Sequence, residues 1–226
     1  MAAEPEPVPA AAPPKRGFAP LRPLRLIFGF FTVLPLARAG SMTEIARGAW
    51  LLPQVAVFLG GAEGAAAWGL LELFGPGVTA ALVLAVALLL TGLHHADGLA
   101  DFGDALMVHG DRTRRLEVLK DKTMGIGAAG ALVIVYLTTW AALSELFSQR
   151  QGMELIWYLV AVEVAARLSL LAAASTGHPS HAGSGSAFIG QQKGWRGAAG
   201  IALSLAILIA AGLFTGFRVA ALAGAA

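Results

Sequence analysis

The 226-residue chain contains no cysteine, and only 13% of its residues are charged. The lack of cysteine excludes disulfides, thiolate metal ligands and thiol nucleophiles. Soluble domains carry roughly 25% charged and about 45–50% apolar residues, whereas 57% of this chain is hydrophobic. Too few charges remain to cover a water-soluble surface, and a formal net charge of +2 is too small to indicate nucleic-acid binding. The composition therefore predicts an integral membrane protein.

Five apolar stretches approach the length of about 20 residues that a helix needs to cross a bilayer. They cover residues 49–73, 78–93, 126–147, 155–174 and 198–217. Their many glycines and alanines favour close packing of helices in lipid. We therefore predict an all-α fold: a polytopic membrane helix bundle with about five to seven transmembrane helices.

Three other segments complete the predicted organisation. Residues 1–20, rich in proline and alanine, are expected to form a disordered tail before a single membrane domain over 21–226. Residues 24–37 are short, contain Pro35 and have basic residues on both sides, which favours a helix lying in the membrane interface over a full span. Residues 177–197 are rich in glycine, serine and histidine, which predicts a loop long enough to fold over a ligand.

The basic residues alternate between the predicted connections. Six Lys or Arg residues precede the first span, and five lie between residues 96 and 125. The positive-inside rule places both segments, and residues 175–196, in the cytoplasm. We expect a multi-pass protein of the cell (inner) membrane with its active site on the cytoplasmic side.

All five aspartates of the chain fall within 25 residues: Asp97, Asp101, Asp104, Asp111 and Asp121. The first three have the spacing i, i+4 and i+7, which places them on one face of a helix. Like charges on one face repel one another, so a cation is expected between them, the alternative being a solvated helix face. Carboxylate oxygens suit Mg²⁺ or Mn²⁺, which commonly also binds substrate phosphates.

A basic segment follows the aspartates. Gly110 is expected to end the first helix and Asp111 to cap a second one. Arg112, Arg115 and Lys120 of this second helix are candidates for phosphate binding, with contact to anionic lipids as the alternative.

Three further residues complete the candidate site. Asp121, at the end of the second helix, is a candidate metal ligand beside Asp97, Asp101 and Asp104. His95 is a candidate general base, metal ligand or interfacial residue. Arg167 lies in a predicted span, where it either pairs with Glu163 or faces the site. A carboxylate-bound divalent cation beside arginines predicts chemistry on a diphosphate or phosphodiester.

Residues 91–104, with the sequence TGLHHADGLADFGD, resemble the signature of cobalamin synthase, a family also called adenosylcobinamide-GDP ribazoletransferase. His95, Asp97, Asp101 and Asp104 match this pattern position by position. Residues 115–125 are similar to the family's next conserved segment. Val33, Ala96 and Thr123 depart from the family pattern.

The resemblance implies a specific reaction. Members of the family join adenosylcobinamide-GDP to α-ribazole, or to its 5′-phosphate, and release GMP in a reaction that requires Mg²⁺. Combined with the residue pattern, this predicts that Asp97, Asp101 and Asp104 hold the metal. His95 or an aspartate would accept the proton of the attacking hydroxyl. The expected partners are these two substrates and the lipid bilayer, and the oligomeric state, a homo-oligomer included, is left open.

Two other functions share parts of this residue pattern. CDP-alcohol phosphotransferases also carry aspartates at helical spacing, but their motif has an aspartate three residues before the Asp-Gly pair, where this chain has His94. A divalent-metal transporter normally binds its ion near the bilayer midplane. The cluster around Asp97 instead lies at a helix end and is followed by basic residues that would repel a cation.

Overall fold

The computed structural model describes residues 21–36, 40–121 and 123–215, and all regular structure in these ranges is helical. The predicted all-α class is thus confirmed, while the predicted tail over residues 1–20 lies outside the described residues. In chain order the elements are α1 (Arg22–Phe31), α2 (Met42–Gly48), η2 (Ala49–Leu51), α3 (Leu52–Leu71), α4 (Pro76–Thr91), α5 (His94–Met107), α6 (Arg112–Val118), α7 (Ile126–Gln149), α8 (Glu154–Thr176), α9 (Ser184–Gln192) and α10 (Trp195–Phe214).

Four helical segments of the described chain are long and apolar enough to cross a membrane: Met42–Leu71, which joins α2 to α3, and the helices α7, α8 and α10. The helix α4 meets the same criterion only together with α5, across a bend of 95°. The protein is therefore a multi-pass membrane protein. Its described residues hold four spans, one fewer than the predicted five to seven, or five if α4 and α5 cross as one bent span. The ten residues of α1 reach only about 15 Å, too short to cross, as expected for this segment.

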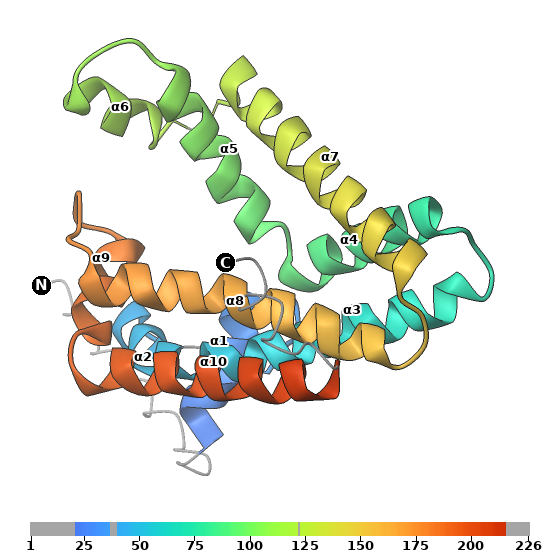
Figure 1. The fold of residues 1–226 in the computed structure, drawn as a ribbon. Helices are drawn as coiled ribbons and strands as arrows, with labels where there is room; N and C mark the ends of the chain where they lie inside the picture. The colour runs from blue at the N-terminus through green and yellow to red at the C-terminus, as the bar shows by residue number, and fades with distance from the viewer. Residues whose placement is uncertain (1–20, 37–39, 122, 216–226) are drawn as a thin grey trace, which may run out of the picture.

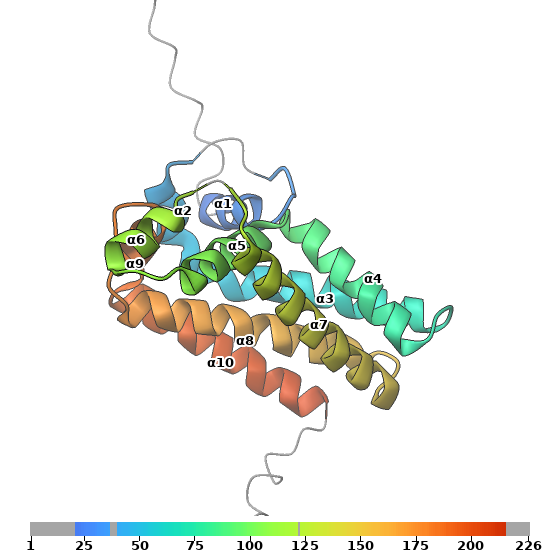
Figure 2. The same ribbon diagram turned by 90° about the horizontal axis from the view of Figure 1, so that it is seen from above.

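The helices form two groups (Figures 1 and 2). The base consists of α1, α2, α3, α8, α9 and α10, with α8 lying between α3 and α10. The arm consists of α5, α6 and α7, and α4 connects it to the base. The helix α7 returns along both α5 and α4 before the chain enters α8.

Small residues bring the long helices of the base together. Gly60 and Gly64 of α3 face α8 so closely that an added methyl group would collide with the backbone of Val160 and Ile156. This spacing of two glycines four residues apart allows helix backbones to approach closely in a membrane. The α3–α8 pair therefore forms the rigid centre of the base.

Close packing at a glycine also sets the position of α5 against α7 in the arm. A methyl group on Gly103 of α5 would lie 2.7 Å from the carbonyl oxygen of Gly127 and 2.6 Å from Cβ of Ala131, both on α7. Only a glycine allows this approach, which brings the end of α5 to the first turn of α7.

The loop predicted over residues 177–197 is wrong in its centre, where the chain forms α9. The buried side chain of Gln192 donates a hydrogen bond from Nε2 to the carbonyl oxygen of Ala46 at 2.6 Å. Phe188 packs against the hydrophobic core of the base. The local glycine and serine content favoured a loop, but the packing of the half-buried Phe188 and the buried Gln192 against the base stabilises a helix.

Candidate active site

A sharp turn separates α4 from α5, the helix that carries the aspartate motif. Gly92 and Leu93 both have left-handed backbone conformations, with φ of 62° and 63°. Gly92 adopts this conformation without strain, whereas Leu93 is an uncommon non-glycine example. The turn redirects the chain by 95°, so α5 is not a straight continuation of an apolar helix. The turn thereby separates the polar motif from the apolar helix α4 that precedes it.

Asp97, Asp101 and Asp104 all lie on the single helix α5, as their spacing predicted. Asp97 is exposed, and Asp101 and Asp104 are half-buried. Partial burial raises the pKa of Asp101 above its usual value, and the charges of Asp97 and Asp104 raise it further. The three carboxylates therefore repel one another on one face, and a cation beside them would relieve that repulsion.

Asp104 also has a structural partner that its spacing did not reveal. Its Oδ2 accepts a hydrogen bond from the amide of Gly125 at 2.7 Å, and its Oδ1 accepts one from the amide of Ala128 at 2.8 Å. Both amides belong to the start of α7, where backbone N–H groups lack partners within the helix. Asp104 therefore joins α5 to α7, and part of its acceptor capacity is used there.

The carboxylates of this region can bind Mg²⁺ only if the substrate supplies further ligands. In the described part of the chain, no group of three or more His, Asp or Glu side chains is arranged to hold a metal ion. Asp121 accepts hydrogen bonds from the amide and hydroxyl of Thr123 at 3.0 and 2.8 Å. Asp97 and Asp101 remain as a pair one helical turn apart. Two carboxylates plus substrate phosphates are a usual environment for Mg²⁺, so these residues fit that ion.

The helix α6 begins where the sequence predicted. Gly110 has a φ of 151°, and Oδ1 of Asp111 accepts a hydrogen bond from the amide of Arg114 at 3.0 Å, which caps the helix. This capping returns the chain alongside α5. The exposed Arg112 and Arg115 thereby lie beside the second half of α5, where they line a cavity with Phe102, Ala105 and Leu106.

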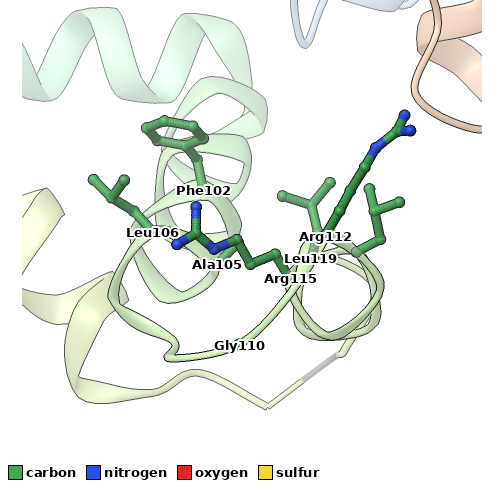
Figure 3. Close-up of a pocket in the computed structure, with 8 residues that line it drawn as sticks. Phe102, Ala105, Leu106, Gly110, Arg112, Arg115 and Leu119 are labelled. Atoms are coloured by element: carbon green, nitrogen blue, oxygen red, sulfur yellow. The ribbon is translucent and has the colours of Figure 1, made fainter.

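A cavity of about 550 Å³ lies between α5 and α6 (Figure 3). Arg115 extends across it towards Phe102 and Leu106, and Arg112 extends away from α5. A guanidinium nitrogen of Arg112 donates to the carbonyl oxygen of Ser180 in the base at 3.4 Å. The cavity is lined by Phe102, Ala105, Leu106, Gly110, Arg112, Arg115, Leu116 and Leu119. Lys120, the third predicted phosphate ligand, is exposed and does not line it.

His95 lies in the first turn of α5 and interacts with the base. Burial lowers its pKa, and the positive charge of Arg167 and the neighbouring His94 lower it further. A neutral imidazole can accept a proton. Arg167 itself is buried and forms an ion pair with Glu163, one of the two arrangements that the sequence left open.

A second cavity, which the sequence analysis did not predict, opens beside the histidines. It has a volume of about 460 Å³ and lies between α1, the start of α5, α8 and α9. Phe30, Phe31 and Phe188 line it together with His94 and His95. The only available signal was the aromatic pair in residues 24–37, whose partner lies over 150 residues further along the chain.

Comparison with known proteins places the chain in a family. The model of cobalamin-5-phosphate synthase matches residues 23–226. An adenosylcobinamide-GDP ribazoletransferase of Methanococcoides burtonii is 32% identical over 174 residues, covering 74% of this chain and 64% of the relative. One of Halorubrum lacusprofundi is 38% identical over 183 residues, covering 76% and 68%. The matched region thus spans about two thirds of these relatives. No solved structure matches the chain. Because the family model covers nearly all of the sequence, the chain belongs to the cobalamin-5-phosphate synthase family.

Proposed function

We propose that the protein joins adenosylcobinamide-GDP to α-ribazole, or to α-ribazole 5′-phosphate, and releases GMP. The match of the family model to residues 23–226 carries this proposal. The relatives from M. burtonii and H. lacusprofundi are named for transfer of ribazole to adenosylcobinamide-GDP. No observation favours a CDP-alcohol phosphotransferase or a metal transporter.

The proposed cofactor is Mg²⁺, held by Asp97 and Asp101 together with oxygens of the substrate diphosphate. When bound, the ion would supply positive charge that offsets the charge of the diphosphate and of the leaving oxygen. Asp104 contributes negative charge to the same face while it holds α7. Asp121, which follows α6 in the chain, stays a candidate ligand.

The remaining steps use side chains of α5, α6 and α8. A ribazole hydroxyl attacks the phosphorus atom on the cobinamide side of the diphosphate; an O–P bond forms, and the P–O bond to GMP breaks. His95, whose pKa is lowered by burial and by the charge of Arg167, accepts the hydroxyl proton. Arg115 and Arg112 bind the phosphate of the departing GMP through charge-assisted hydrogen bonds, with Lys120 and Arg167 as additional positive charges.

We place this reaction at the cytoplasmic face of the cell (inner) membrane. The support is the distribution of basic residues. The connection between α3 and α4 contains no Lys or Arg, whereas α6 alone contains three. Loops rich in Lys and Arg stay in the cytoplasm, which orients the arm and its aspartates inward.

The direct test incubates the purified protein with adenosylcobinamide-GDP, α-ribazole and Mg²⁺ and measures GMP and cobalamin together. Equal amounts of both products are expected, and EDTA should abolish their formation until Mg²⁺ is restored. The variants Asp97→Asn and Asp101→Asn should each slow GMP release by at least about tenfold. Glu145→Gln, at the opposite end of α7, serves as the charge-matched control. GMP release that is insensitive to EDTA and to both aspartate variants would overturn the metal assignment.

A further inference from the structure

The 460 Å³ cavity beside the histidines has the dimensions and lining of a small-molecule site. Pockets for such ligands measure about 300–1,000 Å³ and combine apolar walls with a few polar groups. Phe30 and Phe31 come from α1, His94 and His95 from α5, and Phe188 from α9. The cavity therefore forms where helices of the base meet the first turn of α5, the first helix of the arm.

Its aromatic side chains form one cluster. The ring centroids of Phe30 and Phe31 are 5.0 Å apart, and each lies 5.9 Å from the centroid of Phe188. The His94 ring lies 6.4 Å from Phe30, and the His95 ring lies 6.4 Å from Phe31. Ring faces and edges at such spacings favour a flat aromatic guest, which can stack on one ring and meet the edge of another. An acyl chain would gain no such contacts.

The histidines add polar atoms to this lining. Nδ1 of His94 lies 2.8 Å from the carbonyl oxygen of Thr91. Because a carbonyl only accepts, Nδ1 carries the hydrogen and donates it, so Nε2 is the second polar atom that His94 brings to the lining. Ala173, Ala174, Ser184 and Gly185 are the small residues of the lining and leave room for a ring. The lining thus suits a planar aromatic molecule that also carries polar groups.

From these contacts we infer that the cavity binds the heteroaromatic base of the riboside acceptor. This inference rests on the proposed function, since it assigns a place to one of its two substrates. With the heteroaromatic ring packed against the cluster that Phe31 and Phe188 form by edge-to-face contact, the attached ribose leaves the cavity past His95. The attacking hydroxyl then lies at the first turn of α5, which also carries Asp97. The cavity between α5 and α6, with Arg112 and Arg115, is left for the guanine nucleotide.

The test measures equilibrium binding of α-ribazole to the full chain in lipid nanodiscs, so that the result does not depend on turnover. Phe188→Leu keeps an apolar side chain but removes the ring, and should weaken α-ribazole binding about tenfold, the scale of one lost base–aromatic stack. Phe188→Tyr keeps the ring and should bind within about twofold of the unaltered protein. Phe74→Leu, on the exposed turn after α3, is the matched control and should change nothing.

A second measurement distinguishes loss of the riboside-binding cavity from general misfolding of the variant. Binding of adenosylcobinamide-GDP to Phe188→Leu should stay within about twofold of the unaltered protein, and the preference for α-ribazole over the corresponding adenine riboside should fall. Phe31→Leu should show the same selective loss. The inference is overturned if both leucine variants bind α-ribazole normally, or if they lose both substrates equally. If α-ribazole binding depends on the rings of Phe31 and Phe188 but no GMP is released, the proposed reaction is wrong, whereas the assignment of this cavity to the riboside is supported.

Discussion

Asp104 and Gly125 lie 21 residues apart in the chain, yet Oδ2 of Asp104 accepts the hydrogen bond of the Gly125 amide at 2.7 Å. The contact fastens the C-terminal half of α5 to the start of α7, where a carboxylate also interacts favourably with the helix dipole. Asp104, the third carboxylate on the predicted face of α5, thus also connects α5 to α7.

We expect Asp104→Asn to destabilise the protein, because an amide side chain offers one acceptor oxygen where the carboxylate uses two. Leaving one of the two amides without its charged partner costs about 1–3 kcal/mol, so the midpoint of thermal unfolding in detergent should fall by several degrees. Asp97→Asn, on an exposed side chain of the same helix, should lower activity and leave the midpoint unchanged. Equal unfolding midpoints for the two variants would show that Asp104 does not stabilise the contact between α5 and α7.

Gly103 and Gly98 lie on the same helix and should respond oppositely to alanine. A methyl group on Gly103 meets the carbonyl oxygen of Gly127 at 2.7 Å, whereas nothing lies within 4 Å of one on Gly98. Gly103→Ala should cost about 1–3 kcal/mol through overpacking, while Gly98→Ala should be neutral or stabilising by up to about 1 kcal/mol. Thermal unfolding of the two variants decides this, and a tolerated Gly103→Ala would show that α5 and α7 are less closely packed.

Arg115 and Arg114 are neighbours on α6 with different surroundings. Arg115 lines the cavity beside α5 (Figure 3), whereas Arg114 forms an exposed ion pair with Glu117 at 3.0 Å. Arg115→Gln should raise the KM for adenosylcobinamide-GDP about tenfold, as expected for a lost hydrogen bond to a charged group. Arg114→Gln should leave it unchanged, because exposed pairs contribute little. Equal effects would instead indicate general attraction of the anionic substrate to α6.

The buried pair of Glu163 and Arg167 should behave as a unit. Replacing only Arg167 with methionine leaves the largely buried carboxylate of Glu163 without its partner, which costs up to about 3–5 kcal/mol. The double variant Glu163→Gln/Arg167→Met removes both charges and should recover much of that loss. A double-mutant cycle on thermal unfolding measures the coupling, and strictly additive losses would mean that the two side chains do not stabilise each other.

The absence of native cysteine makes the orientation testable by single introduced thiols. Leu73→Cys, between α3 and α4, should react with a membrane-impermeant maleimide in right-side-out vesicles. Thr113→Cys, on the exposed face of α6, should react only in inside-out vesicles, because the basic residues around it hold this segment in the cytoplasm. Labelling of Thr113→Cys from the outside would invert the proposed topology.

Local features of the chain predicted much of this arrangement. The aspartate spacing placed Asp97, Asp101 and Asp104 on one helix, and Gly110 with Asp111 marked the break and the cap that follow. Four of the five predicted spans are confirmed as helices that can cross alone, and the fifth, α4, does so only with α5. Such features depend on residues a few positions apart, which is why they can be predicted without tertiary contacts.

The sequence alone determined that the protein is helical, lies in a membrane and concentrates its acidic groups on one short segment, since composition and helical periodicity are local properties. Only the tertiary structure decided that Asp104 caps α7, that Gln192 anchors α9, and that Phe31 and Phe188 line one cavity. These contacts join segments far apart in the chain. They depend on how closely small residues such as Gly60 and Gly103 let helix backbones approach, and no local pattern encodes which partner each helix meets.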